Sequence, residues 1–169
     1  AKMTREQAIS AIEEHFDSGD FFNILAERIA IPSTSQEPDK RPALYQYLQD
    51  NIGPYLEERG YSVSIHDNPD PAGGPFLIGE RQEGDDLPTV LTYGHSDTVR
   101  GLEGEWQEGR SPWKMEKAGD RWYGRGTADN KGQHSINIAA LAKVLETRGK
   151  LGFNSRILIE MSEESGSAG

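Results

Sequence analysis

The sequence predicts a mixed α/β domain in which helices pack on a mixed sheet. Segments with helix-like spacing of apolar residues alternate along the chain with short runs of β-favouring residues, which is typical of layered α/β proteins. Two of the short runs are close enough in sequence to form a hairpin, so antiparallel pairing is expected as well. The length of 169 residues fits one domain.

Three segments have the apolar periodicity of a helix: residues 4–31, 42–59 and 129–148. The first is expected to break at residues 17–20, where Asp, Ser and Gly cluster. In the second, Gly53 and Pro54 should kink or divide the helix, because proline lacks an N–H and its ring crowds the preceding turn. Gly60 suits the position that follows this helix, since glycine readily adopts the left-handed conformation found there.

Short runs of β-favouring residues predict the strands. They are residues 61–65, 76–78, 88–93 and 156–161, together with a hairpin within 113–122 that turns at Ala118–Asp120. Residues 89–93, TVLTY, are nearly all β-favouring, and we predict that this run forms a central strand of the sheet.

Composition and charge exclude several classes of protein. The chain has 18 Lys and Arg against 28 Asp and Glu, a formal net charge of −10, which opposes binding to nucleic acid or anionic lipid. It has no cysteine, so disulfides, thiolate metal sites and cysteine nucleophiles are excluded. No apolar run approaches the roughly 20 residues of a membrane span, and no signal-peptide pattern opens the chain, so a cytoplasmic protein is expected.

The content of large apolar residues is low. Leu, Ile, Val and Phe together number 33 of 169 residues, which with the high net charge lies near the margin of disordered chains. Either part of the chain is unfolded, or its core is completed by residues outside this sequence.

The first of three motifs with potential metal ligands is residues 93–99, YGHSDTV, at the end of the predicted central strand. Side chains two residues apart on extended backbone point the same way, so His95 and Asp97 should face one side. One imidazole nitrogen could then bind a metal while the carboxylate holds the proton on the other nitrogen. The alternative is a strand-end histidine that only hydrogen-bonds to a nearby aspartate.

The second motif is residues 123–132, YGRGTADNKG, which leads into the third helix. Asp129 could be a metal ligand at the helix start, or simply an N-cap residue, a position that aspartate favours for structural reasons. A phosphate-binding loop is disfavoured, because the Gly-Lys-Ser/Thr ending of a P-loop and the full glycine set of a dinucleotide-binding turn are absent.

The third motif is residues 159–166, IEMSEESG, in which a predicted strand leads directly into Glu163 and Glu164. Adjacent residues on an extended chain point in different directions. One carboxylate could therefore bind a metal while the other faces the substrate as a proton shuttle. The alternative is a solvated carboxylate pair at the end of a loop.

In order and spacing, GHSDTV, YGRGTADNKGQ and EMSEESGSAG resemble the motifs of the co-catalytic zinc peptidases. This family includes acetylornithine deacetylase, succinyl-diaminopimelate desuccinylase, aminoacylase, carboxypeptidase G and carnosinase-like dipeptidases. The resemblance covers nearly the whole chain, and it implies a three-layer αβα catalytic domain with a mixed sheet. Residues 1–169 correspond to the N-terminal half of that domain, so the rest of it and an inserted dimerisation and lid domain are expected to lie outside this sequence.

The resemblance also implies a role for each candidate residue. His95, Asp129 and Glu164 correspond to metal ligands, with Asp129 bridging two ions and followed by a cis peptide bond. Asp97 corresponds to the carboxylate that orients His95, and Glu163 corresponds to the general base. The implied cofactor is a pair of Zn²⁺ ions, with Co²⁺ or Mn²⁺ as alternatives.

The implied reaction is hydrolysis of an amide bond in an N-acyl amino acid or short peptide by a zinc-activated water. The full-length enzyme is expected to be a homodimer without nucleic-acid or membrane partners. Two further ligands in this family come later in the chain, so residues 1–169 alone are expected to bind metal weakly and to be inactive. Deacylase and dipeptidase both stay open, and a non-catalytic binding module that retains the fold is the alternative function.

Overall fold

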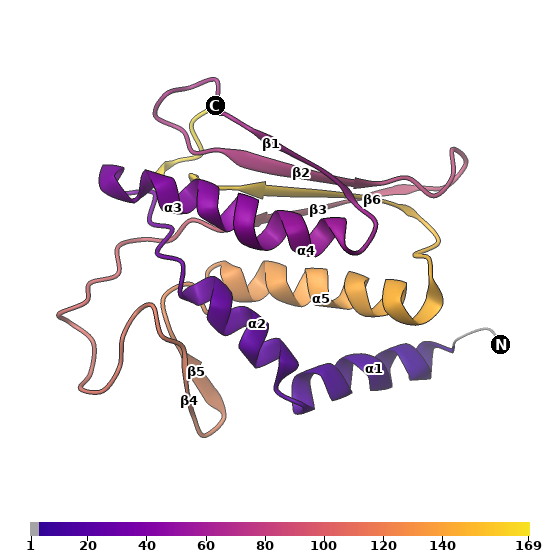
Figure 1. The fold of residues 1–169 in the computed structure, drawn as a ribbon, viewed down its shortest axis with the longest axis horizontal. Coiled ribbons are helices and arrows are strands. Elements are labelled where there is room, and N and C mark those ends of the chain that lie inside the picture. The colour runs from indigo at the N-terminus through magenta and orange to yellow at the C-terminus, as the bar shows by residue number, and fades with distance from the viewer. Residues whose placement is uncertain (1–3) are drawn as a thin grey trace.

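The protein, in a computed structural model that describes residues 4–169, contains a four-stranded mixed sheet with helices packed along it (Figure 1). The strand order is β1, β2, β6, β3, with bounds Ser62–His66, Phe76–Arg81, Asn154–Glu160 and Thr89–His95. The pairs β1–β2 and β2–β6 are antiparallel, whereas β3 and β6 are parallel. A separate hairpin consists of β4 (Glu116–Ala118) and β5 (Arg121–Tyr123). The predicted α/β class, mixed sheet and hairpin are confirmed.

The helices follow the predicted segments closely. They are α1 (Arg5–Asp17), α2 (Asp20–Ile29), α3 (Arg41–Gln46), α4 (Gly53–Glu57) and α5 (Lys131–Arg148), with a π-helical segment at Tyr47–Ile52 and 3₁₀ turns at Pro38–Lys40 and Glu163–Ser165. The predicted break in the first segment is confirmed between α1 and α2, where Gly19 has a φ of +89°. In the part of the chain that the structure describes, no helix is both long and apolar enough to cross a membrane.

The predicted kink at Gly53 and Pro54 takes a different form. Helical backbone runs without interruption from α3 to α4, but residues 47–52 form a π-helical segment. A π-turn is wider than an α-turn. It accommodates Pro54, which donates no hydrogen bond and whose ring would crowd the carbonyl group four residues earlier. Gly60, with a φ of +83°, follows the end of this helix as predicted.

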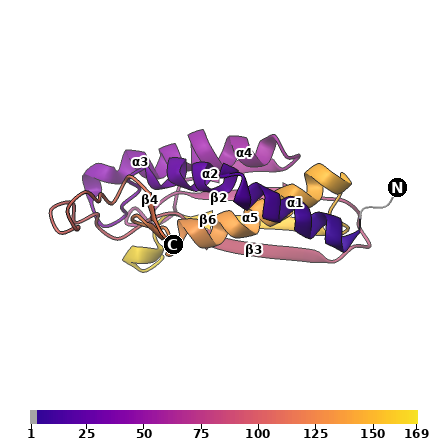
Figure 2. The same ribbon diagram turned by 90° about the horizontal axis from the view of Figure 1, so that it is seen from below.

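The main core lies between the helices and one face of the sheet (Figures 1 and 2). Leu77, Ile157 and Ile159 project from β2 and β6 into this core and are buried. They join a cluster that includes Tyr47, Leu48, Ile52, Leu56 and Ile138 from the π-helical segment, α4 and α5. A second cluster joins α2 to the hairpin and to α5. The low apolar content therefore still yields an ordered core, which the helices form with one face of the sheet.

The opposite face of the sheet is only partly covered. Arg156 and Leu158, which alternate with the buried residues of β6, keep intermediate exposure. Within residues 4–169 the helices pack on the other face, so the third layer of a three-layer sandwich is not among the described residues.

The strand predicted to be central is an edge strand among residues 4–169. In β3, the side chains of Val90, Leu91 and Tyr93 are 44%, 67% and 47% exposed. Among these residues the prediction is wrong, because β6, which is distant in sequence, lies between β2 and β3 and is the one strand paired with β3. The prediction relied on the continuous apolar run, which is typical of a buried parallel strand. Such a run does not indicate which strands lie beside it in the sheet.

Lys131 ties the start of α5 to the end of α2. Its side chain is fully buried, and Nζ donates hydrogen bonds to the carbonyl oxygens of Arg28 and Ile31 at 2.9 and 2.7 Å. Burial lowers the pKa of Lys131 to about 7, although the charge of Asp97 acts in the opposite direction. These contacts hold the first turn of α5, and with it the residues that precede the helix, against α2.

Gly132 is required at the same turn. A Cβ atom at this position would lie 1.8 Å from the carbonyl oxygen of Thr127, a backbone atom that cannot move without shifting the loop. Gly132→Ala is therefore expected to lower the free energy of unfolding by about 2–3 kcal/mol, as measured by chemical denaturation. Gly104→Ala is the matched control, because a Cβ there meets nothing within 4 Å. Equal stability of the two variants would contradict this close approach.

Candidate metal centre

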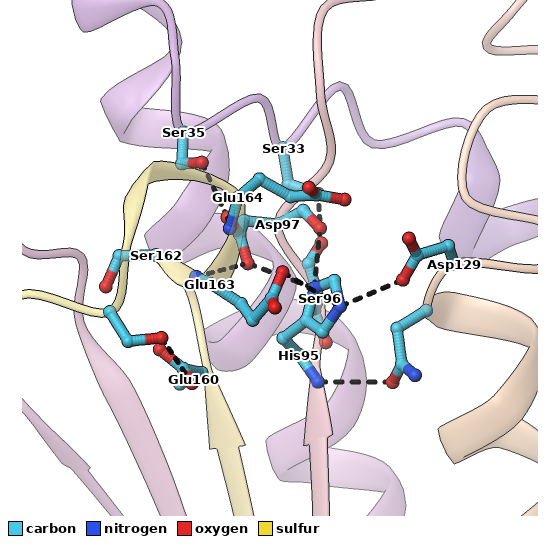
Figure 3. Close-up of polar contacts among 12 residues, drawn as sticks. Ser33, Ser35, His95, Ser96, Asp97, Asp129, Glu160, Ser162, Glu163 and Glu164 are labelled. Atoms are coloured by element: carbon cyan, nitrogen blue, oxygen red, sulfur yellow. Dashed lines mark hydrogen bonds and ion pairs between the residues drawn. The ribbon is translucent and has the colours of Figure 1, made fainter.

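The three motifs meet at one edge of the sheet (Figure 3). Strands β3 and β6 are parallel neighbours whose register pairs His95 with Glu160, so both strands end at the same level. The carboxyl ends of parallel strands are the usual position of binding sites in α/β proteins. The segment after β6 supplies Glu163 and Glu164, and the segment that leads into α5 supplies Asp129.

His95 lies at the centre of this group, with its side chain 6% exposed. Its Nδ1 lies 3.1 Å from the carbonyl oxygen of Asp97 and 3.3 Å from Oδ1 of the same residue. Because both of these atoms are acceptors, Nδ1 carries the proton and donates. On the other side of the ring, Nε2 faces Oδ1 of Asp129 at 3.0 Å and Oε2 of Glu163 at 3.5 Å.

The electrostatic surroundings of His95 are strongly acidic. Burial by itself lowers the pKa of this imidazole, but the hydrogen bonds and charge of Asp97, with a contribution from Glu163, raise it to about 9. The pKa of Glu164 is raised, first by burial and then by the charge of Asp129. A carboxylate whose ionisation is opposed by burial and by neighbouring negative charge, as that of Glu164 is, favours a bound cation.

Asp97 is fully buried and joins three segments of the chain. Its carboxylate accepts hydrogen bonds from Ser35 Oγ at 2.5 Å, from the Glu163 N–H at 3.2 Å and from the Glu164 N–H at 3.0 Å. It also lies beside the imidazole of His95. One carboxylate therefore positions the end of β3, the turn after β6 and the loop before α3.

Asp129 does not cap α5. Asn130 occupies the N-cap position, without a capping hydrogen bond from its side chain, and the Asp129–Asn130 peptide bond is cis. The Asp129 carboxylate is 69% exposed and points towards His95 rather than towards the helix (Figure 3). The helix-cap alternative therefore does not describe this side chain.

The donor atoms fit a divalent metal ion. One ligand atom from each of His95, Glu163 and Glu164 lies within 4.8 Å of the others. Two ligand atoms on a tetrahedral zinc lie roughly 3.4 Å apart, given metal–ligand distances of about 2.1 Å. The contacts from His95 to Asp129 and Glu163, at 3.0 and 3.5 Å, bracket that separation. Imidazole with carboxylates is a donor set that suits zinc and its neighbours in the first transition series.

Several residues that support the centre escaped sequence reasoning. Ser35 holds Asp97, and Gln36 donates from Nε2 to the carbonyl oxygen of Glu164 at 3.0 Å. Asn130 Oδ1 accepts from the His95 N–H at 3.2 Å. The position of Asn130 next to Asp129 in the motif could have indicated its role near the site. Ser35 and Gln36 lie more than sixty residues from the residues they contact, and no feature of the sequence indicates those contacts.

A buried hydrogen-bond chain lies behind Asn130. Its Oδ1 also contacts His134 Nδ1 at 3.2 Å, and because this oxygen is an acceptor, Nδ1 carries the proton. His134 Nε2 then accepts from the Tyr47 hydroxyl at 2.8 Å. Burial, followed by the charges of Arg28 and Lys131, holds the pKa of His134 well below its usual value. His134 is thus a neutral, buried residue whose hydrogen bonds join Asn130 to Tyr47 behind the site.

Comparisons with known proteins agree with this geometry. The family model described as peptidase family M20/M25/M40 matches residues 91–169. A cysteinylglycine-S-conjugate dipeptidase of Corynebacterium striatum is 37% identical over 113 residues, which are 66% of this chain and 24% of the relative. An acetylornithine deacetylase of Yersinia pestis is 30% identical over 152 residues, 88% of this chain and 38% of the relative.

Comparison with a solved structure shows that the fold is similar as well. Human carnosine dipeptidase 1 matches with a TM-score of 0.83 and 29% identity, covering 96% of this chain and 35% of that protein. The chain thus spans roughly a quarter to two fifths of the length of these relatives.

Proposed function

Because the chain belongs to the peptidase M20/M25/M40 family, we propose that it forms the metal-binding part of a zinc-dependent enzyme that hydrolyses an amide bond. The observation that carries this proposal is the convergence of His95, Asp129, Glu163 and Glu164 at the ends of β3 and β6. The substrate would be a short peptide or an N-acyl amino acid. A non-catalytic binding module is disfavoured, because none of the five residues that correspond to site residues of the zinc peptidases is replaced in this sequence.

We assign His95, Asp129 and Glu164 as residues that would hold two zinc ions, with Asp129 the carboxylate that would serve both. The exposure of Asp129 supports this role, since only its Oδ1 contacts His95 and its Oδ2 remains available. The charge of Asp129 reaches Glu164, so the two carboxylates lie in one electrostatic environment. When bound, zinc lowers the pKa of water towards neutrality and polarises the substrate carbonyl group.

Glu163 is assigned as the general base. Its side chain is 43% exposed, so it can face a substrate, and Oε2 lies near the imidazole of His95. In this role the carboxylate accepts a proton from the attacking water and then delivers it to the nitrogen of the leaving amine. Asp97 positions both the candidate ligand His95 and the candidate base Glu163, because it contacts the His95 ring and the backbone N–H of Glu163.

Residues outside this sequence complete the enzyme in our proposal. We propose that residues 1–169 form the first part of the catalytic domain, and that a later part supplies further ligands and the contacts of a cytoplasmic homodimer. The short span relative to the curated relatives supports this division. Residues 1–169 alone are then expected to bind zinc weakly and to show no turnover.

The test uses the full-length protein with a panel of dipeptides and N-acetyl and N-succinyl amino acids. About two zinc ions per chain are expected, and hydrolysis of at least one substrate class should disappear on chelation and return with added zinc. The class that is cleaved distinguishes dipeptidase from deacylase. Hydrolysis that persists after complete metal removal, or zinc-loaded protein that cleaves nothing in the panel, would contradict the proposal. Zinc-dependent turnover by residues 1–169 alone would contradict the division.

A further inference from the structure

A second potential site lies in the loop that precedes the β4–β5 hairpin. Several residues of 101–110, together with Tyr123 at the end of β5 and Arg125 after it, line an open cavity of about 540 Å³. The course of the loop can be followed in Figure 1. None of the metal-centre residues lines it. The lining residues that matter here are Leu102, Glu105, Trp106, Arg110, Tyr123 and Arg125. A volume of several hundred cubic ångströms is typical of sites for small molecules.

Two arginines, Arg110 and Arg125, line this cavity without forming an ion pair in the part of the chain that the structure describes. Among residues 4–169, no carboxylate lies within ion-pair distance of Arg110 or Arg125. Nε of Arg125 is also buried without a hydrogen-bond acceptor in the described residues. Unpaired buried donors are uncommon in folded proteins. In a chain with a net charge of −10, two such arginines beside one cavity are a local exception to the overall acidity. The pKa of Glu103 is lowered by its hydrogen bond from Trp113 and, in part, by the charge of Arg125.

Aromatic rings hold both guanidinium groups in place. Cζ of Arg110 lies 3.6 Å from the ring centroid of Tyr123, and Cζ of Arg125 lies 5.5 Å from that of Trp106. Nη1 of Arg110 also donates to the side chain of Gln107 at 3.0 Å. A stacked guanidinium keeps its edge available for hydrogen bonds in its own plane. The Arg110 guanidinium is therefore held between the Tyr123 ring and Gln107. The Arg125 guanidinium lies near the Trp106 ring.

The loop itself is held in one conformation. The Trp106 indole N–H donates to the carbonyl oxygen of Gly101 at 2.7 Å. The backbone N–H of Arg125 donates to the carbonyl oxygen of Pro112 at 2.8 Å. Leu102 has a φ of +54°, a left-handed conformation that is unfavourable for a leucine. Such residues concentrate at binding sites, where the surrounding contacts maintain them.

We propose that this cavity binds a monocarboxylate that carries an apolar or aromatic group. The planar edge of a guanidinium matches the two oxygens of a carboxylate. Trp106 and Leu102 offer apolar surface for the rest of the ligand, and Glu105 at the lining repels a second negative charge. A monoanion is therefore preferred over a phosphate dianion. This proposal is independent of the hydrolytic function, because no metal ligand contributes to the site.

The probes are benzoate, acetate and inorganic phosphate, titrated into the protein while the Trp106 indole N–H signal is followed by NMR. Trp106→Phe identifies that signal. Benzoate should shift it saturably in the millimolar range, and acetate and phosphate should bind several-fold more weakly. The absence of a saturable shift with benzoate overturns the site, and tighter binding of phosphate than of benzoate overturns the assignment to a monocarboxylate.

Variants locate the binding. Arg110→Gln and Arg110→Lys should each weaken benzoate binding about tenfold, because lysine keeps the charge but loses the planar fork. Arg125→Gln should have a similar effect. Arg121→Gln removes the same charge from β5 outside the cavity and should leave binding unchanged. Arg110 is in a surface loop, so its variants remain informative even if Arg125→Gln impairs folding. Benzoate affinity that is unaffected by both Arg110 variants contradicts the proposal.

Discussion

Glu163→Gln is expected to reduce turnover of the full-length protein by a factor of roughly 10² to 10⁴ while leaving its metal content unchanged. The amide has nearly the size of the carboxylate but cannot accept a proton from water. The Glu163 N–H would still donate to Asp97, so the turn after β6 should keep its position. The measurements are steady-state kinetics on the best substrate of the panel and elemental metal analysis of the same samples.

Two variants control for this result. Glu164→Gln changes the adjacent carboxylate, which we assign as a ligand, and should lower the metal content as well as the rate. Glu57→Gln, on the exposed side of α4, should change neither quantity. An unaffected rate in Glu163→Gln would remove Glu163 from the role of base. Loss of metal from Glu163→Gln would instead make it a ligand, as its place within 4.8 Å of the other donors allows.

Asp97→Ala should be the most destabilising change at the metal centre. The fully buried carboxylate accepts from Ser35 and from two backbone N–H groups, and its removal leaves these partly buried donors unpaired. Because unpaired buried donors cost about 1–3 kcal/mol each, we expect the free energy of unfolding to fall by about 4 kcal/mol. Zinc affinity should fall about 10- to 100-fold, since His95 loses the group that orients its ring.

Chemical denaturation and zinc titration measure the two effects. Ser35→Ala removes one of the three donors to Asp97 and should cost only about 1 kcal/mol. Asp120→Ala, in the exposed turn of the hairpin, should stay within about 0.5 kcal/mol of the parent protein. If Asp97→Ala proved no more destabilising than Ser35→Ala, the carboxylate would not be the junction of the three segments.

Local signals in the sequence placed most element boundaries. The gap between α1 and α2, the end of α4 near Gly60 and the turn of the hairpin all fall where glycine permits a backbone conformation that other residues avoid. The π-helical segment before Gly53 was not predicted. Proline signals that a regular helix is disturbed, but the packing of Tyr47, Leu48 and Ile52 into the core keeps the chain helical through the disturbance.

The candidate residues could also be named from sequence, since His95, Asp129 and the Glu163–Glu164 pair each stand in a motif beside a predicted element, and the resemblance to the zinc peptidases assigned their separate roles. Their surroundings could not. Ser35 belongs to an unremarkable loop, and nothing in its neighbours indicates a contact with Asp97, which lies 62 residues later. The orientation of Asp129 towards His95 likewise depends on how α5 is set against the sheet.

The sequence by itself determined which segments are helices and strands and which side chains have the chemistry of a metal centre, because periodicity, glycine placement and donor type are local properties. Only the tertiary structure decided that β6 lies between β2 and β3, and that β3 is therefore the edge of the sheet within residues 4–169. The same pairing brings the ends of β3 and β6 together, so that Asp97 can hold the backbone of Glu163 and Glu164. Strand pairing across a long stretch of chain depends on the packing of the whole core, and the residue pattern of one strand does not identify which strand lies beside it.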